Sequence, residues 1–415
     1  MLNVIKIAGR NLARYHRRTL LTSILIVIGM VGVLLFIAVT GSFKTMMIGQ
    51  FTDSVLGHLE VHRKGYVASI DNLPLNLNMG AGAAARVREA LDGTSEVATW
   101  SPRLKLGAMF SNFTETTSIR LNGIDPAKEA ATLPLLAGRI VEGATGGPLV
   151  DRGQILIPQL LARGMKVKVG DTVVLVATNR DGSVNGKTFV VKGVLESITG
   201  PGGRDGYVHY DDARELLRLP EAEVSEFAVR LKNPDQLARV NRLLTERLGP
   251  DAGPQGAPLL EVHTWADLSP FANLARMIDL MTVFIKVVLV AIVLISVMNV
   301  MVMAVYERIR EIGTIAAIGT PPRRILALFL AEGLLLGVAG TIVGTLLSLA
   351  AIYALNLMHL TFSFGQQQDL LLAPVIGSGD VAAIAAVVIV VSVLASLQPA
   401  WKASRMDPIV ALRHV

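Results

Sequence analysis

The sequence has no cysteine and is poor in charge, since only 17% of its 415 residues are Asp, Glu, Lys or Arg. Without cysteine the chain cannot build a disulfide framework, a thiolate metal site or a cysteine nucleophile. A soluble domain carries about 25% charged residues, so the low charge and the 52% hydrophobic content argue against a purely soluble protein. The same content excludes a disordered chain. The formal net charge of +6 is compatible with a nucleic acid as partner, with an anionic membrane surface, or with neither.

Four long apolar runs stand out in the sequence. A membrane helix needs about 20 mostly apolar residues, and such runs occupy 20–39, 287–305, 325–355 and 381–400, with Glu332 as their one charged residue. The first run follows a basic segment, as in a signal peptide. The apolar part of a signal peptide is only about 7–15 residues long, however, and no small-residue cleavage site follows. We therefore predict four membrane helices, the first of them an uncleaved anchor.

The charges beside these runs predict their orientation. Basic residues gather before the first run, between the second and third, and after the fourth: Lys6, Arg10, Arg14, Arg17 and Arg18; Arg308, Arg310, Arg323 and Arg324; Lys402, Arg405 and Arg413. Because basic flanks stay in the cytoplasm, we predict that both termini are cytoplasmic (N-in/C-in) and that 43–275 and 356–380 lie outside. Residues 43–286 contain 27 basic and 27 acidic side chains. The excess positive charge therefore lies on the flanks of the apolar runs, where it indicates topology, and no nucleic-acid partner is expected.

The segment between the first two runs has the mixed polarity of a folded aqueous domain. Its patterns predict strands near 57–61, 103–110, 117–124 and 227–231, and helices near 83–91, 211–218 and 234–248. Breaks rich in Gly and Pro lie at 143–148, 200–206 and 249–254. A β-rich insert is expected at about 149–198, with hairpin-type turns at Asp181-Gly182 and Asn185-Gly186. The fold class is thus a multi-pass α-helical membrane protein with a large α+β extracytoplasmic domain.

The second span is expected to extend beyond the bilayer. Residues 268–305 contain no glycine and only Pro270, near the start, so as one helix they would reach about 57 Å, whereas the membrane needs about half of that. The first span also continues past residue 40 without a break. Two such helices would form a stalk, which either joins the domain passively or couples it rigidly to the membrane.

Enzyme chemistry is not evident in the sequence. His58 and His62 share a strand face in HLEVH, which is not the helical HExxH zinc motif, so we expect a structural role. Gly186-Lys187-Thr188 resembles the end of a phosphate-binding loop, but Asp181 stands where that motif needs glycine. Asp211-Asp212 is interpreted as a helix start. We expect no catalytic residue, no metal and no cofactor in this chain.

The membrane region carries the residues of greatest interest. The amphipathic stretch YERIREIGTIAAIGTPPRRIL follows the second span, and a helix of this kind either lies on the membrane interface or docks on a cytoplasmic partner. Glu332 is costly in lipid and should face protein or water, in helix packing or in coupling, and Asn299 has the same two interpretations. Gly333-x-x-x-Gly337 and Gly340-x-x-x-Gly344 permit close helix approach, either within the protomer or across a dimer.

Three blocks resemble the FtsX-like permease family of ABC transporters, the type that includes MacB and the LolC/LolE pair. They are AGRNLARYHRRTLLTSILIVIG, VYERIREIGTIAAIGTPPRRILALFLAEGLLLGVAGTIVG and PAWKASRMDPIVALRHV, about a fifth of the chain. The outer domain is similar to the family's MacB-like periplasmic core only in general pattern. Pro321-Pro322 departs from the family pattern and leaves the end of the coupling helix open.

The resemblance implies a division into 1–42 (basic helix and first span), 43–275 (periplasmic domain) and 276–415 (permease domain). In the last part it implies a stalk and second span to 305, a coupling helix at about 306–320, spans at 325–355 and 381–400 around the outer loop 356–380, and a cytoplasmic tail. The motif positions that match the ATPase-coupling helix are Glu307, Arg308, Arg310, Glu311, Gly313 and Gly319.

The resemblance also implies partners and a mechanism. Two copies of a separate cytoplasmic ATPase would bind ATP and magnesium, a second, identical or different permease would complete the transporter, and movement would pass to the outer domain by mechanotransmission. GHLEVHRKGY and HTWADLSPF favour the LolC/LolE-like branch, in which an inner-membrane permease moves a lipoprotein, lipid or other hydrophobic cargo, with a possible lipoprotein carrier. The alternatives are MacB-type efflux with a periplasmic adaptor, FtsX-like signalling to a cell-wall enzyme, and a membrane-anchored sensor without an ATPase.

Overall fold

A computed structural model describes residues 2–143, 146–198, 203–249, 259–364 and 367–413. The chain forms two compact units. The helical unit comprises 1–44, 275–362 and 371–415, and the sheet domain comprises 45–274 together with 363–370.

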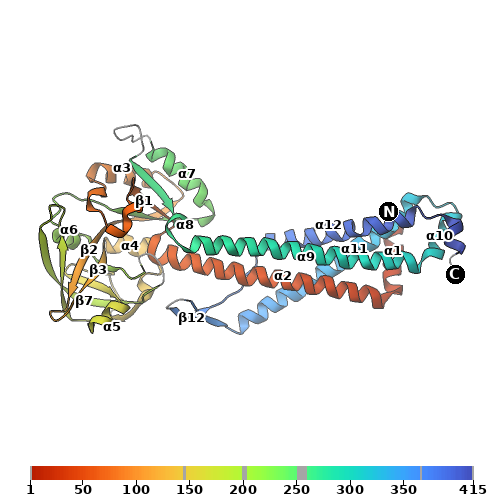
Figure 1. Cartoon of the computed structure of the whole chain (residues 1–415), viewed down its shortest axis with the longest axis horizontal. Coiled ribbons are helices and arrows are strands. Elements are labelled where there is room, and N and C mark those ends of the chain that lie inside the picture. Colours follow the sequence, from red (N-terminus) through yellow and green to blue (C-terminus); the bar gives the residue numbers. More distant parts are fainter. Residues whose placement is uncertain (1, 144–145, 199–202, 250–258, 365–366, 414–415) are drawn as a thin grey trace. The chain divides into compact units, whose positions relative to one another are not determined.

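The helical unit contains four helices that are long and apolar enough to cross a membrane, as the sequence predicts. Its helices are α1 (Leu2–Arg14), α2 (His16–Phe51), α9 (Phe271–Glu307), α10 (Ile309–Ala317), α11 (Pro322–Leu357), α12 (Ser378–Ser404) and α13 (Pro408–Arg413). The long helices run alongside one another in Figure 1, and their facing sides bury an apolar core that includes Ile26, Val293, Phe329 and Val388.

The helix α9 runs unbroken for 37 residues and begins directly after Pro270. At 1.5 Å per residue its length is about 55 Å, which agrees with the continuous helix expected from the missing glycines. The helix α2 likewise continues past residue 40, and a π-helical turn, Thr52–Leu56, follows it. Both predicted long helices are therefore present.

Between α11 and α12 the outer loop contains structure that the sequence did not predict. The strands β11 (Thr361–Phe364) and β12 (Gln367–Leu371) pair in a small two-stranded sheet.

The sheet domain contains ten strands among the residues described. They are β1 (Leu59–Arg63), β2 (Val97–Ser111), β3 (Thr116–Ile124), β4 (Ile140–Gly143), β5 (Gln154–Pro158), β6 (Thr172–Thr178), β7 (Val184–Leu195), β8 (Gly206–His209), β9 (Glu226–Leu231) and β10 (Leu260–Thr264). The helices are α3 (Ala81–Asp92), α4 (Pro126–Thr132), α5 (Gln159–Met165), α6 (Tyr210–Leu216), α7 (Leu237–Leu248) and α8 (Trp265–Leu268). The strands and helices expected from sequence are present with shifted ends, whereas parts of all three predicted Gly/Pro breaks lie outside the described residues.

Six strands close on themselves as a barrel. β2 pairs with β3, β3 with β8, β8 with β5, β5 with β7, β7 with β6, and β6 again with β2. Its core includes Leu106, Phe110, Ile155, Leu175 and Phe189. The strands β5, β6 and β7 of the range 149–198 find partners in β2 and β8, which lie outside that range in sequence.

The turn between β6 and β7 corrects one prediction. Gly182 has φ +83° and takes the left-handed conformation that a tight turn needs. Asn185-Gly186, predicted as a second turn, lies within β7, where both residues pair with β6. One turn suffices to reverse the chain here, so the chain does not turn again at Asn185-Gly186.

The long strand β2 extends beyond the barrel into the remainder of the sheet. Its first half pairs with β9, which continues the order to β1 and β10. The helices α3 and α7 bury Val87, Leu91, Val240 and Leu244 in the same core as Phe227. This second part of the sheet positions the buried charges described below.

Candidate functional site

The predicted coupling helix begins one turn later than expected. Glu307 is the last residue of α9, and Arg308 breaks the helix with φ −115° and ψ 17° before α10 begins at Ile309. The helix within the predicted range of about 306–320 is therefore α10, Ile309–Ala317. Gly319, with φ +93°, follows it in a conformation that favours glycine, so the chain turns there before Pro321-Pro322.

The break directs Arg308 into the protein, towards Glu332 of α11. The Arg308 guanidinium donates from Nη1 to Glu332 Oε1 at 2.9 Å, and both side chains are buried, at 8% and 3% exposure. Its Nε donates to Glu311 Oε2 of α10 at 3.2 Å. A carboxylate buried in a membrane helix thereby gains a cationic partner, as an intramembrane charge requires.

The N-terminal helix α1 joins the same network. Asn11 donates from Nδ2 to Glu332 Oε1 at 2.7 Å, and Arg14 Nη1 lies 3.7 Å from Glu311 Oε1. Sequence reasoning missed Asn11. The available signal was the need of Glu332 for donors, but only the fold shows which donors reach it.

The C-terminal motif packs against α10. The helix α13 contacts α10, and its Ala411 is buried. Asp407 accepts a hydrogen bond from the Ile409 N–H at 2.9 Å, directly before Pro408 starts the helix. An acidic cap and proline in the first turn are both favourable at a helix N-terminus. The three sequence blocks that carry the family resemblance therefore meet in one place, on α1, α10, α11 and α13.

The glycines of α11 form two packing faces within the protomer. A Cβ at Gly333 or Gly337 would lie 1.8 Å from Ser396 Oγ or 2.7 Å from Ser392 Cβ, both on α12. A Cβ at Gly340 or Gly344 would lie 2.7 Å from Ile26 Cγ2 or 2.8 Å from Met30 Cβ, both on α2. The small-xxx-small pattern thus serves contacts inside one chain.

The other predicted residues divide by exposure. Gly313 is buried in α10, whereas Glu307 and Arg310 are exposed. Asn299 lies on the exposed side of α9 and does not pack inside the protomer. Among the described residues it makes no hydrogen bond.

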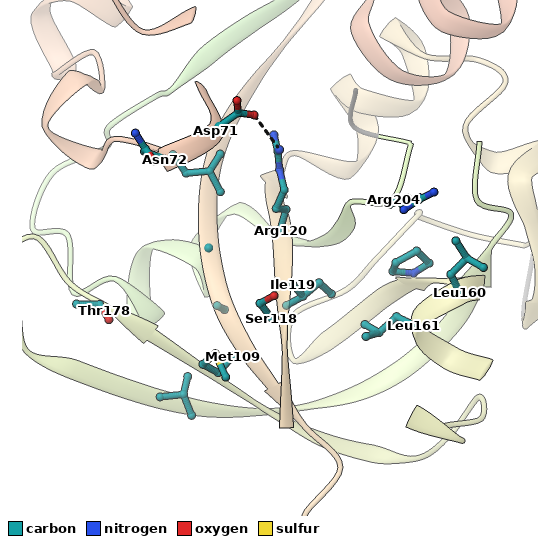
Figure 2. A pocket seen from close by; sticks show the side chains of 15 residues that line it. Asp71, Asn72, Met109, Ser118, Ile119, Arg120, Leu160, Leu161, Thr178 and Arg204 are labelled. Carbon is teal, nitrogen blue, oxygen red and sulfur yellow. Dashed lines mark ion pairs between the residues drawn. The ribbon is translucent and has the colours of Figure 1, made fainter. Parts of the chain in front are cut away.

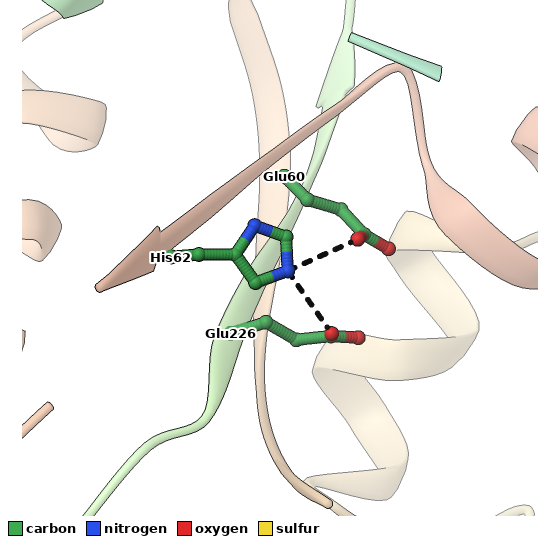
Figure 3. A group of neighbouring side chains, drawn as sticks. All are labelled: Glu60, His62 and Glu226. Carbon is green, nitrogen blue, oxygen red and sulfur yellow. Dashed lines mark hydrogen bonds and ion pairs between the residues drawn. The ribbon is translucent and has the colours of Figure 1, made fainter. Parts of the chain in front are cut away.

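A second cluster of charges is buried in the sheet domain. It consists of Glu60 and His62 of β1, Arg103 and Lys105 of β2, Glu129 of α4 and Glu226 of β9. Figure 3 shows the His62 ring between two carboxylates, with Nε2 3.3 Å from an oxygen of Glu60 and from one of Glu226. Three carboxylates face two permanent cations, so a protonated His62 balances the cluster.

This cluster has the composition of a divalent metal site, since the ligand atoms of Glu60, His62 and Glu226 all lie within 4.8 Å of one another. Lys105 Nζ is 2.9 Å from Glu226, however, and Arg103 Nη1 is 3.0 Å from it. A divalent cation would be repelled by both. We therefore interpret the cluster as an internal ion-pair network, in line with the structural role expected for His62.

The cluster makes the stability of the sheet domain depend on pH. Burial disfavours a charged His62, but its hydrogen bonds to Glu226 and Glu60 outweigh burial and raise its pKa above 6.5. The stabilisation is fully present below the unfolded-state pKa and is lost as pH rises through the folded-state pKa. Burial lowers the pKa values of His58 and His263 below 6.5. Their contribution to the stability of the domain is therefore present above pH 6.5 and is lost as the pH falls below it.

We expect the amides of β1 and β9 to exchange hydrogen faster, after correction for intrinsic rates, as pH rises above 6.5. His62→Gln should remove this part of the pH dependence. Hydrogen exchange of the full chain, with and without the substitution, measures it. An identical loss of protection in wild type and variant would contradict the prediction.

Two other motifs noted in the sequence, Gly186-Lys187-Thr188 and Asp211-Asp212, have structural roles. Lys187 lies in β7 and donates to Asp212 at 2.7 Å, so the Gly-Lys-Thr string forms no phosphate loop. Asp212 also accepts from the Gly153 N–H at 2.6 Å. Asp211 and Asp212 lie in the first turn of α6, as expected.

Comparison with known proteins places these features in a family. The MacB-like periplasmic core domain matches residues 19–247, and the FtsX-like permease C-terminal domain matches residues 283–408. The lipoprotein-releasing system transmembrane protein LolC of Neisseria meningitidis serogroup B is 25% identical over 405 residues, 94% of this chain and 92% of that protein. LolC of Xylella fastidiosa is 24% identical, covering 71% of this chain and 72% of its own length.

A shorter similarity extends to an exporter. The macrolide export ATP-binding/permease protein MacB of Syntrophobacter fumaroxidans is 37% identical over 113 residues, 27% of this chain and 14% of that protein. The MacB-like model alone spans more than half of the 415 residues. The chain is therefore a multi-pass inner-membrane protein with a periplasmic domain, and it belongs to the LolC/MacB-type permease family of ABC transporters.

Proposed function

We propose that this permease couples to a separate cytoplasmic ATPase and moves a lipoprotein, lipid or other hydrophobic cargo out of the outer leaflet of the inner membrane. The observation that carries the proposal is the buried Arg308–Glu332 pair, which ties the coupling helix α10 to the membrane helix α11. The LolC relatives, named for lipoprotein release, support this class of cargo. We expect ATP and magnesium to bind to the ATPase and not to this chain.

The orientation belongs to the same proposal. The basic flanks support a cytoplasmic location for both termini and α10, on the side where an ATPase would bind. Residues 356–380, which have no Lys or Arg, then lie on the periplasmic side.

The coupling helix presents an apolar surface suited to docking. Ile318, at its end, is 80% exposed, and Ile315 is 40% exposed. A groove of about 240 Å³ is lined by Ile315 and by other residues of α1, α10 and α11, among them Ile7, Ile312 and Leu328. Isolated exposed apolar residues on a charged helix fit a groove or pocket of a partner protein.

Movement of α10 has a direct route into the membrane. Arg308 is held by Glu332 of α11 and Glu311 of α10, while α9 continues without a break from Glu307 back to Phe271. A rotation of α10 would thus act on two membrane helices at once. In this proposal, mechanotransmission is the transfer of movement from α10 to the membrane helices α9 and α11.

Copurification tests the proposal. The full chain, purified from its native membrane, is expected to retain an ABC ATPase, and Ile318→Asp is expected to reduce the retained ATPase about tenfold or more, as for a buried interface anchor. Val375→Asp is the control, because Val375 is 71% exposed and lies in the outer loop. Equal recovery of ATPase with both variants would refute docking through α10.

Efflux is the second candidate, favoured by the similarity to the macrolide export protein. The same purification separates the two functions. A lipoprotein or lipid trapped with the complex supports the first, whereas retention of a periplasmic adaptor without such cargo supports efflux.

Asn299 indicates where a second permease would pack. An amide exposed on a membrane helix gains most from a partner in a neighbouring helix, and we propose that α9 of a second copy supplies it. Because the chain has no cysteine, Asn299→Cys introduces a single thiol. Oxidation in native membranes is expected to give a disulfide-linked dimer, whereas Leu346→Cys, on the exposed side of α11, should remain monomeric. A monomeric Asn299→Cys protein would exclude self-pairing through this face.

A further inference from the structure

The sheet domain carries a groove that the proposed coupling does not use. Its volume is about 690 Å³, within the range of about 300–1,000 Å³ that is typical of small-molecule sites. It is lined by β2, β3 and β6, by the end of β5 with the start of α5, and by the segment before α3. All of these elements belong to the sheet domain.

The lining combines an apolar part with two arginines. Met109, Ile119, Leu160, Leu161 and Val176 supply apolar surface. In the view of Figure 2, Arg120, Arg204 and Asp71 lie above Ile119, Met109 and Leu161. A molecule that fills the groove therefore meets hydrocarbon on one side and the charged groups of two arginines and one aspartate on the other.

The two arginines are only weakly neutralised. Arg120 Nη1 lies 3.8 Å from Asp71, whose side chain is 95% exposed, and Arg120 Nε lies 3.6 Å from Asp205. Neither distance is that of a hydrogen bond, and Arg120 Nε is buried without an acceptor. Arg204 is exposed and has no ion pair among the described residues. The Arg120 side chain is 39% exposed, so part of it is open to an anion that binds in the groove.

We propose that this groove binds an anionic amphiphile, with the acyl chain against Met109, Leu160 and Leu161 and the carboxylate or phosphate between Arg120 and Arg204. A planar, charged guanidinium is suited to hold either anion through paired hydrogen bonds. A neutral lipid would make no use of the two guanidinium groups, and a small inorganic anion would leave the apolar surface in water. The inference names a substrate class for the proposed transporter but does not depend on α10 or on an ATPase.

The test uses the full chain in nanodiscs of neutral phosphatidylcholine and a photoreactive analogue of palmitate, with the matching photoreactive alcohol as the uncharged probe. Peptide mapping by mass spectrometry locates the labelled residues. The acid is expected to label the segments around Met109 and Leu161 about tenfold more than the alcohol, since hydrogen bonds between charged groups are stronger than those of a neutral hydroxyl.

Three variants sharpen the result. Arg120→Gln with Arg204→Gln should abolish the preference for the acid, and Ser118→Phe, at an exposed position that lines the groove, should block labelling by both probes. Arg242→Gln removes the same charge from the exposed side of α7, outside the groove, and should change nothing.

Equal labelling by acid and alcohol, an acid preference that survives the double variant, or labelling confined to α2, α9, α11 and α12 would overturn the proposal. ATPase retention in the same preparation reports on the proposed function separately. Loss of groove labelling with the ATPase still bound would therefore refute the groove alone.

Discussion

Arg308→Ala is expected to destabilise the helical unit by about 3–5 kcal/mol, the range measured when one partner of a buried ion pair is removed. Among the described residues, the variant leaves the Glu332 carboxylate, at 3% exposure, with Asn11 as its remaining hydrogen-bond donor. It also frees the start of α10 from α11. Thermal unfolding of the detergent-purified chain measures the loss, and Arg310→Ala, on the exposed side of the same helix, is the control, expected to change stability by less than about 0.5 kcal/mol.

A double variant separates the effect of the Arg308–Glu332 pair on stability from its effect on coupling. Replacing both members of a buried pair by apolar residues is often neutral or stabilising, so Arg308→Met with Glu332→Met should recover most of the stability. If the pair transmits movement, the double variant should still fail to link ATP hydrolysis to cargo release. Full transport activity in the stable double variant would show that the pair only supports packing.

Gly333→Leu is expected to prevent α11 and α12 from packing, and the variant should be degraded or aggregate. Even Gly333→Ala should cost about 1–3 kcal/mol, as overpacking does, because its Cβ would lie 1.8 Å from Ser396 Oγ and 2.7 Å from Ser396 Cβ. Resistance to proteolysis in membranes, together with thermal unfolding of the alanine variant, measures both effects.

Two further variants test this explanation. Ser396→Gly should restore stability to Gly333→Ala, because it removes the atoms that the new methyl group meets. Gly32→Ala, on α2 with no atom within 4 Å of the added Cβ, should be neutral or slightly stabilising. If Gly32→Ala proved as damaging as Gly333→Ala, steric contact with α12 would not be the cause.

Much of the architecture could be read from local patterns. The four membrane helices follow from apolar runs of about 20 residues, and the unbroken α9 follows from the lack of glycine after Pro270. The glycine spacing of α11 predicted close packing because residues four apart share a helix face. In each case the signal lies within one helix, so no knowledge of its neighbours was needed.

The barrel was not predictable in the same way. The strands β5, β6 and β7 have a clear alternating pattern, yet their partners β2 and β8 lie far away in the sequence. Alternation identifies a strand and its faces but does not specify which strand lies beside it. The same limit hid the buried charges, because Arg103 and Lys105 resemble surface residues until Glu226 is placed opposite them.

The sequence by itself thus determined which segments enter a membrane, the expected side of their flanks, and which residue, Glu332, needed a partner there. The tertiary structure alone decided that the partners are Asn11 of α1 and Arg308 at the break between α9 and α10, both separated from Glu332 in sequence. It also decided that Gly333 faces α12 while Gly340 faces α2. Helical periodicity is a property of neighbours along the chain, whereas charge partners and packing faces depend on how separate helices meet in space.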